Sequence, residues 1–133
     1  MMVALNSNGE EFNKGLDLFN RAHFFDAHEV LEDAWRSVPG GQPLRLHLQG
    51  VVQLAVAFHH ESTGNNLGAR SVLERALRNL KGAESSLPEV DLDRLRADLA
   101  PWQRYLDDYL NTDDERAIHV VRPPTLPKIA LRR

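Results

Sequence analysis

Two ten-residue segments of this chain match each other, AHEVLEDAWR at residues 27–36 and ARSVLERALR at residues 69–78. They start 42 residues apart and are identical at six of ten positions. In each copy apolar residues recur every three or four positions, which is typical of a helix that packs on one side. Because each copy closes a helical hairpin, the repeat predicts two similar hairpins stacked on one another. Two units are too few for an open solenoid, so we expect a compact bundle.

Helix-breaking residues divide the chain further. The Pro-Gly-Gly triplet at residues 39–41 ends the second helical segment, and Pro43 suits the first turn of the third. Gly64 suits the position after a helix end, and one asparagine of residues 65–66 caps the next helix. No segment alternates long enough to form a strand, so the fold class is all-α, a compact bundle of about five helices built from two stacked helical hairpins. The last helix is expected to bend or restart at Pro101. The predicted helices span about residues 8–20, 24–37, 43–62, 65–84 and 91–111.

The length of 133 residues suits a single all-helical domain over 1–133, with the helical bundle at 8–111. Residues 112–133 contain Pro123, Pro124 and Pro127, so we expect an extended Pro-rich tail. Residues 1–115 carry 11 basic and 19 acidic side chains, a net charge of −8, whereas the chain after Glu115 carries five basic side chains and no acid. The tail is therefore predicted to lie on the acidic body of its own chain or of a second copy, or else to remain a solvated terminus.

Composition excludes several classes of protein. The chain has no cysteine, so any metal must be held by nitrogen and oxygen ligands. A net charge of −3 and an isoelectric point near 6.0 argue against nucleic-acid binding. The sequence has no signal-peptide pattern and no apolar stretch long enough to span a membrane. We therefore expect a cytoplasmic protein with no membrane partner.

The second predicted helix carries polar residues within its apolar stripe. A helical projection of about 100° per residue places His28 between Phe24 and Trp35, with Glu32 one turn further on. A buried polar group without a partner costs about 1–3 kcal/mol, so these side chains need partners or a ligand. One interpretation is a His–Glu pair satisfied within the bundle. The other is a functional site, with Glu29 at its border.

The third predicted helix carries a second polar stripe made of Gln49, Gln53 and His60, whereas His59 falls on the apolar side. If the hairpins stack, this stripe points at His28 and Glu32. Two imidazoles and one carboxylate are ligands favoured by Zn, Fe or Mn. We therefore predict one divalent metal bound by His28, Glu32 and His60, with Glu29 as the catalytic base and Gln49 and Gln53 binding substrate.

Three blocks of the sequence resemble the domain-of-unknown-function family 309. They are FNRAHFFDAHEVLEDAWR at residues 19–36, LQGVVQLAVAFHH at 48–60 and GNNLGARSVLERAL at 64–77. The resemblance covers roughly residues 10–82, and the family consists of small all-helical proteins without an established activity. Its motif positions fall on the six polar residues named above. They also fall on Asn20 and Trp35, which the resemblance adds to the substrate-binding set.

Two functions from different classes fit this pattern. The first is a metal-dependent hydrolase in which the bound ion activates a water molecule and Glu29 removes its proton. The second is a non-catalytic helical-hairpin module that binds a peptide or protein partner, with the polar residues as a buried structural network. No serine has the His–acid neighbour pattern that would indicate a nucleophile.

Overall fold

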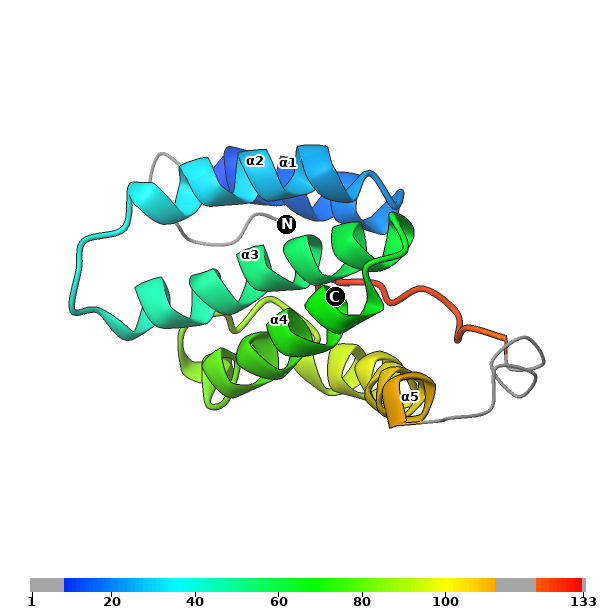
Figure 1. Cartoon of the computed structure of the whole chain (residues 1–133). Helices are drawn as coiled ribbons and strands as arrows, with labels where there is room; N and C mark the ends of the chain where they lie inside the picture. The colour runs from blue at the N-terminus through cyan, green and yellow to red at the C-terminus, as the bar shows by residue number, and fades with distance from the viewer. Residues whose placement is uncertain (1–8, 112–121, 133) are drawn as a thin grey trace.

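The computed structural model describes residues 9–111 and 122–132 of the chain (Figure 1). Within these residues the chain forms α-helices and one short 3₁₀ helix, so the predicted all-α class is confirmed. None of the described helices is long and apolar enough to cross a membrane. The elements are α1 (Gly9–Asn20), α2 (Phe24–Arg36), α3 (Pro43–Ser62), α4 (Asn66–Asn79), the 3₁₀ helix η2 (Ala83–Ser85) and α5 (Leu92–Asn111).

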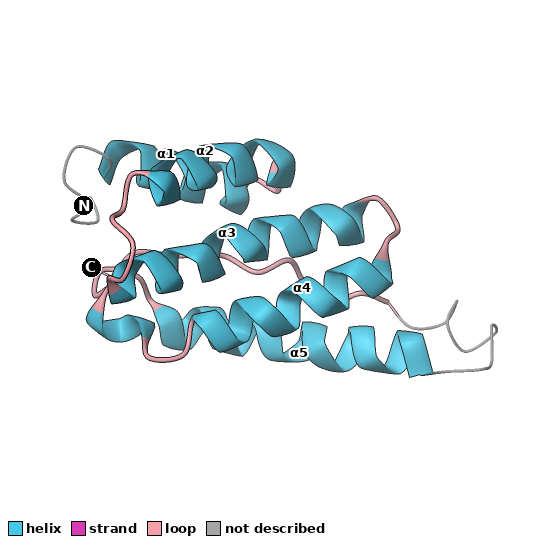
Figure 2. Cartoon of the chain, turned by 60° about the vertical axis from the view of Figure 1, so that its left-hand side comes forward, coloured by secondary structure: helices cyan, strands magenta, loops and turns pink. Residues whose placement is uncertain are grey.

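The helices pack in the order in which they follow one another along the chain. Helix α1 packs on α2, α2 on α3, α3 on α4, and α4 on α5. Figure 2 shows the α1–α2 hairpin above α3, with α4 and α5 below it. The two hairpins predicted from the repeat are thus α1–α2 and α3–α4, joined through the contact between α2 and α3.

An aromatic cluster joins four of the helices at the centre of the core. The ring of Phe58 on α3 lies 6.2 Å from Phe19 of α1, 5.7 Å from Phe24 of α2 and 5.1 Å from Trp102 of α5. Phe19, Phe58 and Trp102 are at most 2% exposed. The contacts of Phe58 with Phe19 and Trp102 are edge-on, and such aromatic pairs contribute about 0.5–1.5 kcal/mol each beyond the area they bury. The cluster fixes the start of α2 against the end of α3, where Phe24 and Phe58 lie.

The predicted cap of the fourth helix is formed, and the fifth helix also has a side-chain cap. The side chain of Asn65 accepts a hydrogen bond of 2.9 Å from the backbone N–H of Gly68 and thereby caps α4. Gly64 has a φ of 86°, the left-handed conformation expected after a helix end. The side chain of Asp91 accepts from the N–H of Arg94 at 3.2 Å and caps α5.

One predicted helix boundary is wrong, and the predicted restart of the fifth helix at Pro101 is not observed. The fourth helix ends at Asn79 instead of about Glu84, because Gly82 adopts a left-handed φ of 77° and η2 follows. The fifth helix does not restart at Pro101 but runs through it. Proline removes the hydrogen bond to the carbonyl four residues earlier, that of Ala97. Ala97 is exposed, so water can satisfy that carbonyl.

The described part of the C-terminal segment lies on the body of its own chain. Residues 122–132 contain no helix, and Leu131 forms an isolated antiparallel bridge with Val90. Figure 1 shows this segment, drawn in orange to red, returning toward the middle of the bundle. Residues 112–121 of the predicted tail fall outside the described residues.

Candidate functional site

The imidazole of His28 contacts the carboxylate of Glu32 on α2. The Nε2 atom of His28 lies 3.0 Å from Oε2 of Glu32, and each side chain is 30% exposed. The second carboxylate oxygen of Glu32 accepts from Arg36 at 3.1 Å. We expected these side chains inside the core. Instead they lie partly exposed at the border of the buried face of α2. Glu32 therefore has partners on its own helix, His28 on one carboxylate oxygen and Arg36 on the other.

An aromatic ring on α2, Phe25, lies between the His28–Glu32 pair and His59 of α3. The ring of Phe25 lies 6.4 Å from the ring of His28 and 5.5 Å from that of His59 on α3. Phe25 is nevertheless 53% exposed. An exposed aromatic ring held between two imidazoles on different helices was missed from the sequence. Only the packing of α2 against α3 brings these positions together.

Trp35 and Arg45 join α2 to the start of α3. The indole Nε1 of Trp35 donates to the carbonyl of Arg45 at 3.0 Å, and the Arg45 guanidinium lies 4.2 Å from the centre of the indole ring. A shallow hollow of about 380 Å³ opens beside this pair. Its lining residues are Gly41, Gln42, Pro43, Arg45, Leu46 and Gln49. Gln49 is therefore placed where a bound group could reach it, which keeps its substrate-binding role as a prediction.

The rest of the polar stripe on α3 turns toward α4. The Oε1 atom of Gln53 accepts from Nδ2 of Asn79 at 2.8 Å. Nδ1 of His60 lies 3.3 Å from Nδ2 of Asn65 in the turn before α4. Both side chains are thus engaged by groups of the second hairpin.

Three His, Asp or Glu side chains do not approach one another closely enough to hold a metal ion anywhere in residues 9–111 and 122–132. The ligand set of His28, Glu32 and His60 stays a prediction, and so does the role of Glu29, which is exposed on α2.

We call the face made of Phe25, His28, Glu32 and Trp35 on α2 and Arg45, Gln49 and His59 on α3 the α2–α3 surface.

Asn20 contacts the C-terminal segment. Its Nδ2 atom donates to the carbonyl of Ile129 at 2.9 Å, and its Oδ1 atom accepts from the N–H of Ile129 at 2.7 Å. Both halves of the amide are therefore occupied by one residue of the segment. The contact joins positions 109 apart in the sequence, so no local pattern could have found it.

His47 is a buried histidine that was not identified from the sequence. His47 on α3 is 6% exposed, and its Nδ1 atom lies 2.7 Å from Oγ of Ser86. No carboxylate within the described residues bonds to this imidazole. The pair anchors the loop after η2 to α3, and we assign it a structural role.

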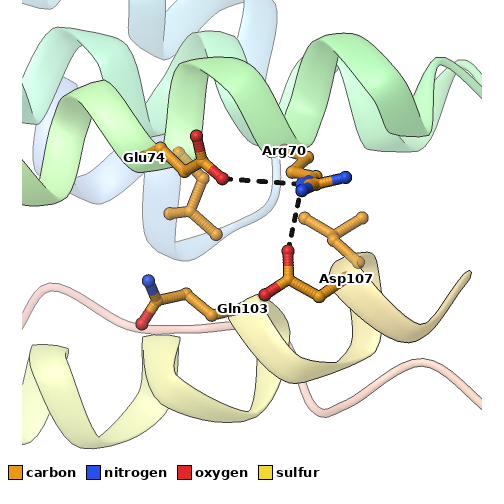
Figure 3. A pocket seen from close by; sticks show the side chains of 6 residues that line it. Arg70, Glu74, Gln103 and Asp107 are labelled. Carbon is orange, nitrogen blue, oxygen red and sulfur yellow. Dashed lines mark ion pairs between the residues drawn. The ribbon is translucent and has the colours of Figure 1, made fainter. Parts of the chain in front are cut away.

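The contact between α4 and α5 contains a small polar hollow (Figure 3). Arg70 on α4 bonds through Nε to Asp107 of α5 at 3.0 Å and approaches Glu74 at 3.5 Å. The hollow measures about 20 Å³, which is room for one water molecule. The Arg70–Asp107 ion pair joins the two helices, and the hollow beside it is too small for a substrate.

These features define a helical-hairpin protein with a half-buried His–Glu pair beside an exposed aromatic ring. Residues 12–72 match the family model of a domain of unknown function, DUF309. The match contains every predicted site residue, and it confirms the resemblance inferred from the sequence. The matched segment runs from α1 into α4 and covers 61 of the 133 residues, so this part of the chain is similar to the DUF309 family.

Two relatives extend this finding. The uncharacterized protein YpuF of Bacillus subtilis (strain 168) is 32% identical over 73 residues, which make up 55% of this chain and 41% of YpuF. An uncharacterized protein of Aquifex aeolicus (strain VF5) is 22% identical over 125 residues, 94% of this chain and 34% of that protein. The chain thus spans less than half the length of both relatives. Neither description names an activity.

Proposed function

We propose that this chain is a helical-hairpin module that binds a basic peptide segment of a protein partner through the α2–α3 surface. The observation that carries the proposal is Phe25, whose ring is 53% exposed yet flanked by the rings of His28 and His59. Aromatic side chains are enriched among the residues that dominate binding energy in protein interfaces. A ring already held in place loses little conformational freedom on binding.

The charge beside Phe25 supports a basic partner. Asp26 and Glu29 are exposed in the same turn and the next turn of α2, and neither is in an ion pair within the described residues. The net charge of −8 over residues 1–115 has the same sign. Complementary charge speeds association and selects partners more than it adds affinity.

The relatives also favour a binding module. The matched segment is 41% of the Bacillus subtilis protein and 34% of the Aquifex aeolicus protein, so it is one part of longer chains there. A domain that accompanies other segments is suited to connect them with a partner.

The test is fluorescence anisotropy with labelled amphipathic peptides of lysine and leucine, and with the same peptides in which glutamate replaces lysine. We expect binding of the basic peptide that weakens with salt and becomes at least about tenfold weaker in Phe25→Ser. Leu67→Ser is the matched control, because Leu67 is 67% exposed but lies on α4. Equal binding by Phe25→Ser and the parent, or equal binding of the acidic peptide, would contradict the proposal.

The His28–Glu32 pair favours a second candidate, the metal-dependent hydrolase. An imidazole nitrogen 3.0 Å from a carboxylate oxygen offers two ligands of the right chemistry on one helix. A third ligand would have to come from α3, by movement of His59 or His60. Equilibrium dialysis with Zn²⁺ tests this candidate: stoichiometric binding lost in His28→Ala and kept in His23→Ala supports it, and no binding by the parent refutes it. Glu29→Gln should then abolish hydrolysis while the metal stays bound.

A further inference from the structure

The C-terminal segment is held chiefly through its main chain. We call residues 122–132 the strap. Asn20 bonds both the N–H and the carbonyl of Ile129, at 2.7 and 2.9 Å. The N–H of Lys128 donates to Asp98 at 3.2 Å, and the carbonyl of Thr125 accepts from the indole of Trp102 at 3.0 Å. Side chains of α1 and α5 thus act toward the strap as a neighbouring strand would.

The strap also inserts apolar side chains between these contacts. Ile129 is 1% exposed, and Pro127 is buried as well. Further along, the carbonyl of Ala130 accepts from the N–H of Asp91 at 2.8 Å. Grooves that bind extended peptides combine two features: hydrogen bonds to the peptide main chain, which give affinity, and pockets for side chains, which give specificity. The contacts of the strap show both, with Ile129 as the side chain in the pocket.

Charge complements this arrangement. Every ionisable side chain of the strap is basic, namely Arg122, Lys128 and Arg132. Asp98 faces the strap from α5, and the ammonium of Lys128 donates to the carbonyl of Asn20 at the C-terminal end of α1 at 2.5 Å. A cation at a helix C-terminus is favourable because the carbonyls there carry partial negative charge.

We propose that Asn20, Asp98 and Trp102 form a peptide-binding groove, and that the strap of a second copy of this chain occupies it by exchange. Each contact depends on the sequence of the strap and not on which copy supplies it. Tethering gives the chain's own strap an effective concentration of about millimolar, so exchange requires high protein concentration or a displaced strap. This groove is separate from the α2–α3 surface, and its test does not depend on the proposed function.

The first test uses full-length chains and the synthetic peptide RPPTLPKIALRR, the sequence of residues 122–133. Ile129→Asp should displace the strap, because burying a charge in the aliphatic pocket is unfavourable, and leave the groove open. The labelled peptide should then bind Ile129→Asp at least about tenfold more tightly than the parent, whose own strap competes. Asn20→Ala/Ile129→Asp should lose this binding, and a scrambled peptide of equal charge should not bind.

The second test mixes two full-length variants. Ile129→Asp keeps the groove and lacks a working strap, whereas Asn20→Ala keeps the strap and has a damaged groove. Analytical ultracentrifugation should show a heterodimer in the mixture that neither variant forms alone. A folded Ile129→Asp that fails to bind the peptide, or a mixture that stays monomeric, overturns the proposal. Should Ile129→Asp lose its helical circular dichroism, Ile129→Ala replaces it in both tests with the same outcomes.

Discussion

Replacing Gly15 with alanine should destabilise the protein, although alanine is the better helix former. Gly15 lies on the face of α1 that packs against α2. A Cβ atom added there would lie 2.5 Å from Cδ2 and 2.6 Å from Cγ of Leu31. Leu31 is fully buried in the core, so its side chain has little room to move away. Favourable carbon–carbon contacts are about 3.5–4.0 Å, so the α1–α2 hairpin has to open.

Two opposing terms set the magnitude. Removing a glycine from a helix interior contributes about 0.5–1 kcal/mol of stability. Overpacking a filled core costs about 1–3 kcal/mol. The cost wins because the contact falls on Cγ as well as on the methyl end of Leu31, and we expect a net loss of about 1 kcal/mol in the free energy of unfolding. Leu31→Ala alone should cost about 2–5 kcal/mol.

Urea unfolding followed by circular dichroism measures these changes. In the double variant Gly15→Ala/Leu31→Ala the clash is absent, so the combined loss should be smaller than the sum of the single losses. Gly40→Ala is the matched control, since a Cβ there meets nothing within 4 Å. The reasoning is refuted if Gly15→Ala is as stable as the parent, or if the two substitutions are additive.

Three further predictions concern pH and packing. Burial raises the pKa of Glu61 above its ordinary value of 4.5, because the charged carboxylate is less well solvated in the folded protein. The protonated carboxyl group therefore adds to the free energy of unfolding below 4.5, and this stabilisation is lost as pH rises through the folded pKa. Glu61→Gln should raise the melting temperature at about pH 7 but not at about pH 3.5. The hydrogen bond from Arg96 lowers the pKa of Glu84 to about 2, so its contribution is present above 4.5 and lost as pH falls toward 2. An acid titration of Glu84→Gln should therefore show a flatter loss of stability over that range, by less than about 1 kcal/mol because the pair is exposed. Ala27→Leu and Ala69→Leu should each lose about 1–3 kcal/mol in urea unfolding, since both alanines are at most 1% exposed; parent-like values for both would contradict the close packing of the hairpins.

The fold could be predicted from the sequence because its signals are local. Gly64, with its left-handed φ, and Asn65, which caps α4, are consecutive residues, and together they mark the boundary between α3 and α4. The repeat adds the pairing of the hairpins. The end of α4 was misplaced because Gly82 stops the helix in a region whose composition stays helical as far as Glu84.

The candidate site could be predicted only in part. A helical projection places His28 and Glu32 on one side of α2, and the structure pairs them at 3.0 Å. The projection does not say which helix covers each side of α3. His59, assigned to the apolar side, therefore proved to be the imidazole beside Phe25, whereas the amide of Gln53 bonds to α4.

The most direct test of the α2–α3 surface is nuclear magnetic resonance of the ¹⁵N-labelled protein titrated with the basic lysine–leucine peptide. The account predicts that the amide signals of Phe25, His28 and His59 shift most, and that the shifts of His28 and His59 require at least about tenfold more peptide in Phe25→Ser. Shifts that centre instead on Asn20, Trp102 and the strap, with Phe25 unaffected, would contradict it.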